Sequence, residues 1–197
     1  MKTYTKTVTV TKPLLRIEHE EYPENPRKNQ DNLGFFITKE RDYQTPDKNE
    51  DLQNIVEGTG ELANNTQEHI ELITERVQEE LGYHVEAIYP VNRYEHSGVS
   101  YSIVPRSGWD VSNCGFYIIT TESMNVLGTP KKFFEKVVRQ ELAEYTAWAN
   151  GEVYAYTLYD EKGEEIDSCG GFYNIEDMRS SLPKEWSKED LDEYLVR

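Results

Sequence analysis

The spacing of hydrophobic and polar residues in the first third of the chain predicts two strands separated by a loop. Residues 3–10 (TYTKTVTV) alternate and are rich in β-branched side chains, a pattern typical of a strand. Residues 34–38 (GFFIT) form a short apolar run, which indicates a buried strand. Residues 20–34 hold two prolines, three asparagines and a closing glycine, so we expect a loop or an extended arm there. Residues 40–65 are polar and carry only a weak helical pattern.

Two segments have the periodicity of amphipathic helices. In residues 66–82, isoleucine, valine and leucine recur every three to four positions and give one apolar face. Thr66 is the expected N-cap of this helix, and Gly82 is expected to end it. Residues 130–151 form the second expected helix, which starts at a proline and ends at an Asn-Gly pair.

The remaining apolar segments alternate like strands and follow one another closely, which favours antiparallel hairpins. We therefore predict an α+β fold, with a mostly antiparallel β-sheet, two main helices packed on it and a short acidic helical C-terminal tail. The expected segments are 1–33 as an N-terminal strand and extended arm, 34–173 as the core domain and 174–197 as the tail. The further strands are expected at 84–95, 99–104, 115–121, 153–160 and 164–169, and the tail helices at 174–181 and 187–195.

The chain is strongly acidic, with 37 Asp and Glu against 21 Lys and Arg and a formal net charge of −16. Such a charge repels nucleic acid and anionic membranes and favours basic protein surfaces. Two interpretations are open: a solvated surface that maintains solubility, or a decoy for a positively charged nucleic-acid channel. The first stretch is a local exception, because Lys2, Lys6, Lys12 and Arg16 precede the first acid at Glu18.

Cysteine content and hydropathy argue against three classes of protein: disulfide-rich, cysteine-zinc and membrane-spanning. The 2 cysteines are too few for a disulfide framework or a cysteine zinc site. No apolar leader follows Met1, and no apolar run is long enough to span a bilayer. We therefore expect a cytoplasmic protein with no membrane partner.

Glu141 lies on the apolar face of the helix expected at 130–151. At about 100° per residue, it falls between Val137 and Tyr145 on the arc that faces the sheet. A buried carboxylate is costly unless it is paired, hydrogen-bonded or bound to a metal. Glu141 is therefore either bonded to Tyr145 or to a tyrosine or arginine of the sheet, or is a general base or metal ligand in a cleft.

Other polar residues stand at the ends of expected strands. His96 precedes the turn at Ser97-Gly98, Asp110 follows Gly108-Trp109, and Asp167-Ser168-Cys169 precedes a pair of glycines. Each also has a purely structural explanation. His96 would be a surface histidine, Asp110 would cap a turn, and residues 167–169 would form a turn with a buried cysteine. Cys169 could also act as a nucleophile if His96 activated it.

Taken together, these residues suit one kind of chemistry. His96, Asp110, Glu141 and Asp167 could cleave a phosphodiester by acid–base catalysis, or through Mg²⁺ held by the three acids. They would suit a structural polar network equally well. Oligomeric state is not predicted.

Five motifs in order give a resemblance to a known family. They are NPRKNQDNLG (25–34), YEHSG (94–98), GWDVSNCGF (108–116), the run from Glu141 to GEVY (151–154) and DSCGGFY (167–173). They resemble a family carried by phages, plasmids and other mobile elements, with motifs such as YDHSG, GxVY and DSCWGFYG. This chain departs from that pattern at Gly170, where the family has tryptophan, and at Asn174, where it has glycine.

The family is similar to anti-CRISPR proteins that inhibit Cas9, and this implies a guide-RNA-loaded Cas9 complex, or its guide RNA, as the partner. Such a complex has a basic channel to which an acidic inhibitor would be steered. The polar positions that the motifs carry over are His96, Ser97, Asp110, Glu141, Asp167, Ser168 and Cys169.

Two mechanisms are open under this resemblance: cleavage of the guide RNA, or non-enzymatic binding that blocks the entry of target DNA. A mobile-element protein that binds a different host partner is a third possibility. A nuclease this acidic needs a local basic patch for phosphate, which residues 2–16 or the outer face of the second helix could supply. Ligand contacts are expected from Ser97, Trp109, Tyr145, Ser168, Lys132, Lys136 and Arg139.

Overall fold

The computed structural model describes residues 13–39, 45–105 and 108–196, so the strand expected at 3–10 lies outside the described residues. The chain divides into two compact units. Unit 2 is the continuous segment Glu24–Asn150, and unit 1 combines the segments Met1–Pro23 and Gly151–Arg197. Each unit has a sheet and a hydrophobic core of its own.

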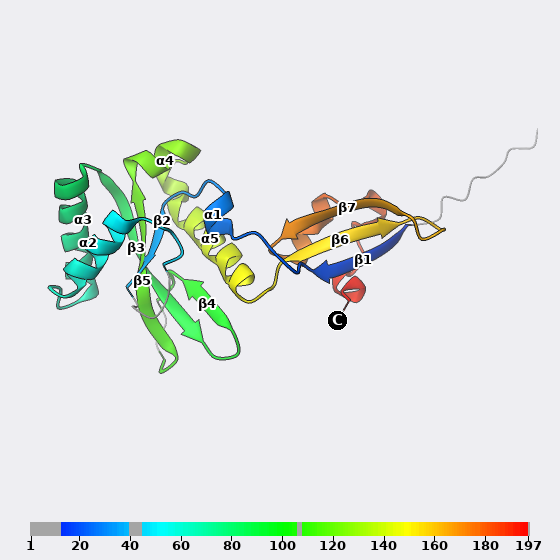
Figure 1. Cartoon of the computed structure of the whole chain (residues 1–197), viewed down its shortest axis with the longest axis horizontal. Helices are drawn as coiled ribbons and strands as arrows, with labels where there is room; N and C mark the ends of the chain where they lie inside the picture. The colour runs from blue at the N-terminus through cyan, green and yellow to red at the C-terminus, as the bar shows by residue number, and fades with distance from the viewer. Residues whose placement is uncertain (1–12, 40–44, 106–107, 197) are drawn as a thin grey trace, which may run out of the picture. The chain divides into compact units, whose positions relative to one another are not determined.

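Unit 2 contains a four-stranded antiparallel sheet in the order β2-β5-β3-β4 (Figure 1). Both faces of β5 are buried, which explains why CGFYIIT is a continuous apolar run rather than an alternating one. Gly115 allows β2 to approach β5, since a Cβ at this position would collide with the carbonyl oxygen of Ile37. The strands are β2 (Phe35–Thr38), β3 (Val85–Glu95), β4 (Val99–Ser102) and β5 (Val111–Thr120).

Helices cover both faces of this sheet (Figure 1). On one face, α2 (Glu50–Gly60) and α3 (Thr66–Arg76) pack on residues such as Phe116 and Ile118. On the other face, α5 (Phe134–Ala149) packs on Tyr117 and Ile119. The short elements of the unit are α1 (Pro26–Asn29), the π-helical turn η1 (Val77–Leu81), α4 (Thr121–Leu127) and the 3₁₀ turn η2 (Lys131–Phe133).

Local hydrogen bonds set where these helices begin. The side chain of Asn49 accepts from the Leu52 amide at the start of α2. At the start of α3 the cap is Asn65, which accepts from the Glu68 amide; the expectation of Thr66 as N-cap was therefore wrong by one residue. The same helical segment ends at Gly82, which has a φ of 71°.

Both edges of the unit 2 sheet are closed by neighbouring groups. At the β2 edge, the amide of Asp47 donates to the carbonyl of Phe36 over 3.3 Å. At the β4 edge, Asn150 exchanges two hydrogen bonds with the backbone of Val99, and Thr146 Oγ1 accepts from the Tyr101 amide over 3.0 Å. The end of α5 is thus tied to the β3–β4 hairpin.

Unit 1 contains a three-stranded antiparallel sheet in the order β1-β6-β7. Leu15, Ile17, Tyr156 and Leu158 form its buried face, which the C-terminal segment covers with side chains such as Trp186. Asn174 caps the first turn of that segment by accepting from the Glu176 amide. The elements are β1 (Leu14–His19), β6 (Tyr154–Tyr159), β7 (Glu165–Phe172), and the 3₁₀ turns η3 (Ile175–Ser180), η4 (Lys184–Trp186) and η5 (Leu191–Tyr194).

The α+β class and its antiparallel pairing are confirmed, but the strands form two sheets instead of one. The two units also do not follow the expected boundaries at 33/34 and 173/174. The physical reason is pairing: β6 pairs with β1 from the start of the chain and with β7 on its other side, which takes the late hairpin and the tail into unit 1. Leu33 and Arg27 are buried in unit 2, so residues 24–33 are not an extended arm. Among the described helices, none combines the length and apolarity required to cross a bilayer.

Candidate functional site

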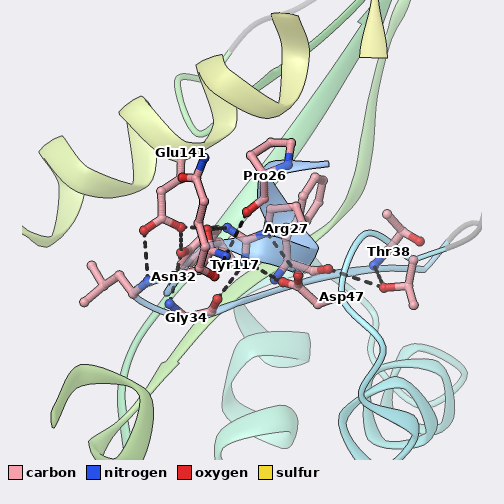
Figure 2. Close-up of polar contacts among 12 residues, drawn as sticks. Pro26, Arg27, Asn32, Gly34, Thr38, Asp47, Tyr117 and Glu141 are labelled. Atoms are coloured by element: carbon pink, nitrogen blue, oxygen red, sulfur yellow. Dashed lines mark hydrogen bonds and ion pairs between the residues drawn. The ribbon is translucent and has the colours of Figure 1, made fainter. Parts of the chain in front are cut away.

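The guanidinium of Arg27 is the centre of a buried polar cluster in unit 2 (Figure 2). Its Nε donates to Asp47 Oδ1 over 3.0 Å, and one terminal nitrogen donates to Asn32 Oδ1 over 2.9 Å and to Glu141 Oε2 over 2.6 Å. The other terminal nitrogen donates to the Gly34 carbonyl over 2.7 Å and to Asp47 Oδ2. Arginine has five N–H donors, and all five therefore have acceptors.

Glu141 reaches this cluster from α5, and its side chain is 11% exposed. Oε1 accepts from the Leu33 amide over 2.9 Å, while Oε2 accepts from both Arg27 and the Tyr117 hydroxyl. Tyr117 lies on β5, so the structure bears out the interpretation of Glu141 as a residue bonded to a tyrosine of the sheet. The Tyr117 hydroxyl also accepts from the Gly34 amide over 3.0 Å.

The electrostatics favour a permanently charged arginine between carboxylates. Burial alone lowers the pKa of Arg27, but hydrogen bonding and charge from Asp47, together with Tyr117 and Glu141, raise it above the ordinary value. Burial raises the pKa of Tyr117, as does the Glu141 charge, against the opposing effect of Arg27. Neither group changes protonation near neutral pH. The arrangement holds segments together rather than moving protons.

The first family-like motif is explained by this cluster. Asn25 caps α1 by accepting from the Arg27 amide over 2.8 Å, and Asn32 donates to the Pro26 carbonyl over 3.1 Å. Leu33 and Gly34 supply backbone groups to Glu141, Tyr117 and Arg27. Arg27 and Asp47 were missed from the sequence because they lie in polar stretches that resemble loops. The one available signal was Glu141, whose position on an apolar face required a cationic or hydroxyl partner.

His96 and Asp110 lie away from Glu141, although all three belong to unit 2. The turn that follows His96 is fixed beside Asn150, since a Cβ at Gly98 would lie 2.8 Å from Asn150 Oδ1. Asn150 comes nine residues after Glu141 on the same helical segment, which corresponds to about 13 Å along the axis at about 1.5 Å per residue. His96 and Ser97 are exposed at this turn. His96 therefore does not lie beside Glu141, as one catalytic site containing both would require.

Asp110 and Trp109 lie beside His96 at the end of the β3–β5 ladder. The amide of Glu95 donates to the Asp110 carbonyl over 3.2 Å, which extends the pairing of Tyr94 with Val111. The Trp109 side chain is 90% exposed. The rings of Tyr94 and His96 stack with centroids 6.5 Å apart and planes 11° apart. The backbone bond between Glu95 and Asp110 therefore brings the exposed Trp109 and the Tyr94–His96 ring pair, which are distant in sequence, to the same end of the ladder.

The candidates on β7 belong to unit 1. Asp167 accepts from the Tyr156 hydroxyl over 3.1 Å, and Ser168 donates to Glu165 over 2.7 Å. Burial and the bond to Asp167 raise the pKa of Tyr156 to about 12. Cys169 is exposed, so the expectation of a buried cysteine was wrong.

Gly170, where the motif resemblance would place tryptophan, has a local explanation in unit 1. The carboxylate of Glu20 lies over Gly170, where a Cβ would collide with it, and it accepts from the Gly171 amide. Glu20 thus covers this position in the chain.

The expected basic patch on the outer face of α5 is partly neutralised. Lys131 pairs with Glu86, and Arg139 pairs with Glu135 one turn away. Lys132 lies 4.9 Å from the centre of the Phe133 ring, and Lys136 is exposed. Tyr145, a predicted ligand contact, is buried against the rings of Phe36, Tyr101 and Trp148.

The donor set does not fit the expected Mg²⁺ site. Across the described ranges, no group of three or more His, Cys, Asp or Glu side chains could hold a metal ion. Glu141 is already paired with the guanidinium of Arg27. Asp110 and Asp167 belong to different units. Comparison with protein-family models, curated proteins and solved structures gives no match for this chain.

Proposed function

We propose that the protein is a non-enzymatic acidic binder that occupies a basic surface of a nucleic-acid-handling partner and blocks the entry of DNA. The partner proposed from the motif resemblance is a guide-RNA-loaded Cas9 complex. The observation that carries the proposal is the distribution of charge along the fold.

The net charge is confined to two segments. Residues 50–81 carry nine acidic side chains and one basic, and residues 151–197 carry thirteen acidic and five basic. All other residues together carry fifteen of each sign, so these two segments account for the formal charge of −16. The first segment is the α2–α3 helix pair with η1, which lies on one face of the unit 2 sheet (Figure 1).

The α2–α3 pair and the π-helical turn η1 that continues α3 present their acids to solvent. Glu57, Glu71, Glu75 and Glu79 are exposed, while the apolar side chains of the same helices pack on the sheet. Glu71 precedes Glu75 by four residues, and Glu75 precedes Glu79 by four, a spacing at which like charges destabilise a helix. Acids near a helix C-terminus also oppose the helix dipole. Glu71 accepts a hydrogen bond from Gln67 over 2.9 Å, but the repeated like charges oppose helix stability, which favours a role in binding for this row.

The arrangement of the expected catalytic residues favours binding over cleavage. Glu141 is occupied by Arg27, Tyr117 and Leu33, and His96 is exposed at a turn about 13 Å along the helix from it. Guide-RNA cleavage by these residues would require them to converge on one phosphodiester. The proposal therefore contains no chemical step.

The test is capture of Cas9, with and without guide RNA, by the immobilised protein at increasing salt. We expect capture of the guide-loaded complex, competition by target DNA and a steep loss of binding as salt rises, because exposed charges are screened. The variant Glu71→Gln/Glu75→Gln/Glu79→Gln is expected to weaken capture. The matched control, Glu161→Gln/Glu164→Gln/Glu165→Gln on the β6–β7 hairpin, removes the same charge from unit 1.

Guide RNA from the same incubations is run on a denaturing gel, with Mg²⁺ or EDTA. Intact guide with blocked DNA cleavage is the expected result. If the unmodified protein shortens the guide RNA and the Glu141→Gln variant leaves it intact, the protein is a nuclease and the proposal is overturned. Salt-independent capture, or equal loss in the two triple variants, would overturn the assignment of the α2–α3 face.

A further inference from the structure

We infer that the exposed aromatic surface at the end of the β3–β5 ladder binds an arginine side chain of a partner protein. This surface, the aromatic tip, consists of Trp109 and the adjacent Asp110, together with the stacked rings of Tyr94 and His96 at the neighbouring end of β3; Glu95, between those two rings in sequence, is paired with Arg93. The inference rests on the proposed function only in that the partner surface is basic. The site itself follows from the contacts within unit 2.

Trp109 is the first sign of a binding site. Its side chain is 90% exposed, whereas Trp186 is 2% exposed and Trp148 stacks on Tyr145. An indole left in water forgoes the favourable transfer of a large apolar surface. Exposed aromatic residues that a fold holds in place are typical of interaction sites, where tryptophan is strongly enriched.

The backbone around the aromatic tip is fixed from two sides. The Glu95 amide bonds to the Asp110 carbonyl, and the Val111 amide donates to the Gly108 carbonyl over 3.4 Å. On the other side, Asn150 at the end of α5 holds Val99 through two hydrogen bonds of 2.9 and 2.8 Å. The Asp110 carboxylate lies against the backbone of Gly108, where a Cβ would be 2.8 Å from Oδ1. The turn that carries Trp109 and Asp110 is therefore hydrogen-bonded to the end of β3.

The charges beside the rings select a cation. Arg93 is the basic residue next to the tip on β3; it bonds to Glu95 over 2.9 Å and its side chain is only 10% exposed. The Asp110 carboxylate has no hydrogen bond or ion pair with another residue in the part of the chain that the structure describes. A nucleic-acid base on the same rings would bring its phosphate toward these carboxylates, which disfavours it.

A guanidinium suits this combination better than an ammonium does. It is planar, so it stacks on an indole, and its edge can donate two hydrogen bonds to one carboxylate at the same time. Trp109 supplies the strongest cation–π surface among the aromatic residues, and Asp110, the neighbouring residue, supplies the acceptor. A lysine side chain would make the charge interaction with Asp110, but its ammonium group is not planar and cannot stack on the indole.

The experiment titrates the ¹⁵N-labelled full chain with a Gly-Arg-Gly peptide and follows the indole Nε1–H signals by NMR. Trp109→Ala identifies the Trp109 signal. We expect that signal alone to shift in a saturable way, at least about threefold more weakly with Gly-Lys-Gly and not at all with the neutral citrulline peptide. Asp110→Asn is expected to weaken the arginine response, and Tyr22→Ala, which removes another exposed aromatic side chain, is expected to leave it unchanged.

Equal shifts with the arginine and citrulline peptides would overturn the inference, because the tip would then bind without selecting charge. A shift with oligothymidylate but none with the arginine peptide would also overturn it and would indicate a base-stacking surface. The peptide assay contains no Cas9. Loss of Cas9 capture with a retained peptide response would therefore contradict the proposed function alone, and full Cas9 capture by Trp109→Ala would contradict the tip as an anchor of that complex.

Discussion

The Arg27 cluster and the aromatic tip are both built from motif residues of unit 2, but they differ in how far their polar groups are satisfied. In the cluster, every guanidinium donor has an acceptor, and Asp47 and Glu141 take backbone amides as well. At the tip, Trp109 is exposed and the Asp110 carboxylate has no partner among the described residues. A saturated polar set holds a fold together, whereas an exposed set with unused bonding capacity is available to a partner.

The largest effect on stability is expected from Arg27→Met. Loss of the guanidinium leaves Asp47 and Glu141 as buried carboxylates without a cation, which costs about 3–5 kcal/mol. Because the chain has two units, amide hydrogen exchange of β2 and β5 should be measured so that unit 2 is followed separately. Arg27→Lys keeps the charge but not the five donors, so we expect it to recover only a part of the loss. A loss below about 1 kcal/mol for Arg27→Met would contradict the structural role.

Glu141→Gln should have a smaller effect of about 1–3 kcal/mol, since an amide oxygen can still accept from Leu33 while the charge opposite Arg27 is lost. The proposed inhibition of Cas9 should persist at temperatures where the variant remains folded. Denaturant unfolding and the capture assay measure the two quantities. Loss of inhibition with unchanged stability would show that Glu141 has a functional role after all.

His69 is a buried residue through which the dependence of stability on pH can be tested. Its Nε2 lies 3.0 Å from the Val56 carbonyl and 3.1 Å from Thr59 Oγ1, in a contact between α3 and α2. Burial lowers the pKa of His69 below 6.5, and the charge of Lys39 lowers it further. The unfolded chain therefore binds the proton more readily, so this contribution to stability is present above pH 6.5 and is lost as the pH falls below it. The free energy of unfolding, measured against pH by denaturant unfolding, should therefore change less steeply below pH 6.5 in His69→Gln. An unchanged slope would mean that other groups cause the pH dependence.

Removal of the acidic row, which consists of Glu71 and Glu75 on α3 and Glu79 on η1, is expected to raise stability rather than lower it. Glu71→Gln/Glu75→Gln/Glu79→Gln removes two like-charge pairs at four-residue spacing and is expected to stabilise unit 2 by about 0.2–0.5 kcal/mol per pair at low salt. The same variant should bind the partner more weakly. Thermal unfolding at low and high salt measures the first effect. A destabilised variant would indicate that these acids have a structural role in the free protein.

The smallest effect on stability is expected at the aromatic tip. Trp109→Ala should change the free energy of unfolding by no more than about 0.5 kcal/mol, because the side chain buries little surface. It should nevertheless remove the arginine response. Urea unfolding of Trp109→Ala beside Arg27→Met gives the sharpest contrast between the two regions. A large loss of stability in Trp109→Ala would mean that the indole is a packing residue.

Much of the secondary structure could be predicted because it depends on local pattern. The run GFFIT is β2, and the apolar face around Ile73 and Val77 marked the helix of α3 and η1. The position of Glu141 on an apolar face also predicted a buried carboxylate, and a tyrosine of the sheet is among its partners. The strand at Leu14–His19 was missed, since LLRIEH was not separated from the expected arm.

The sequence by itself determined the α+β class, the helices expected at 66–82 and 130–151, the acidic character and the burial of Glu141, because periodicity and charge are properties of neighbouring residues. Tertiary structure decided which strands share a sheet, and so placed the β6–β7 hairpin beside β1 in unit 1. It also decided that Arg27 is paired with Glu141, and that Asp110 is bonded through its backbone to Glu95 at the end of β3. These outcomes depend on contacts between residues that are far apart in the sequence, 114 positions for Arg27 and Glu141. An amphipathic pattern indicates which side chains are buried, but it does not indicate which partners they contact.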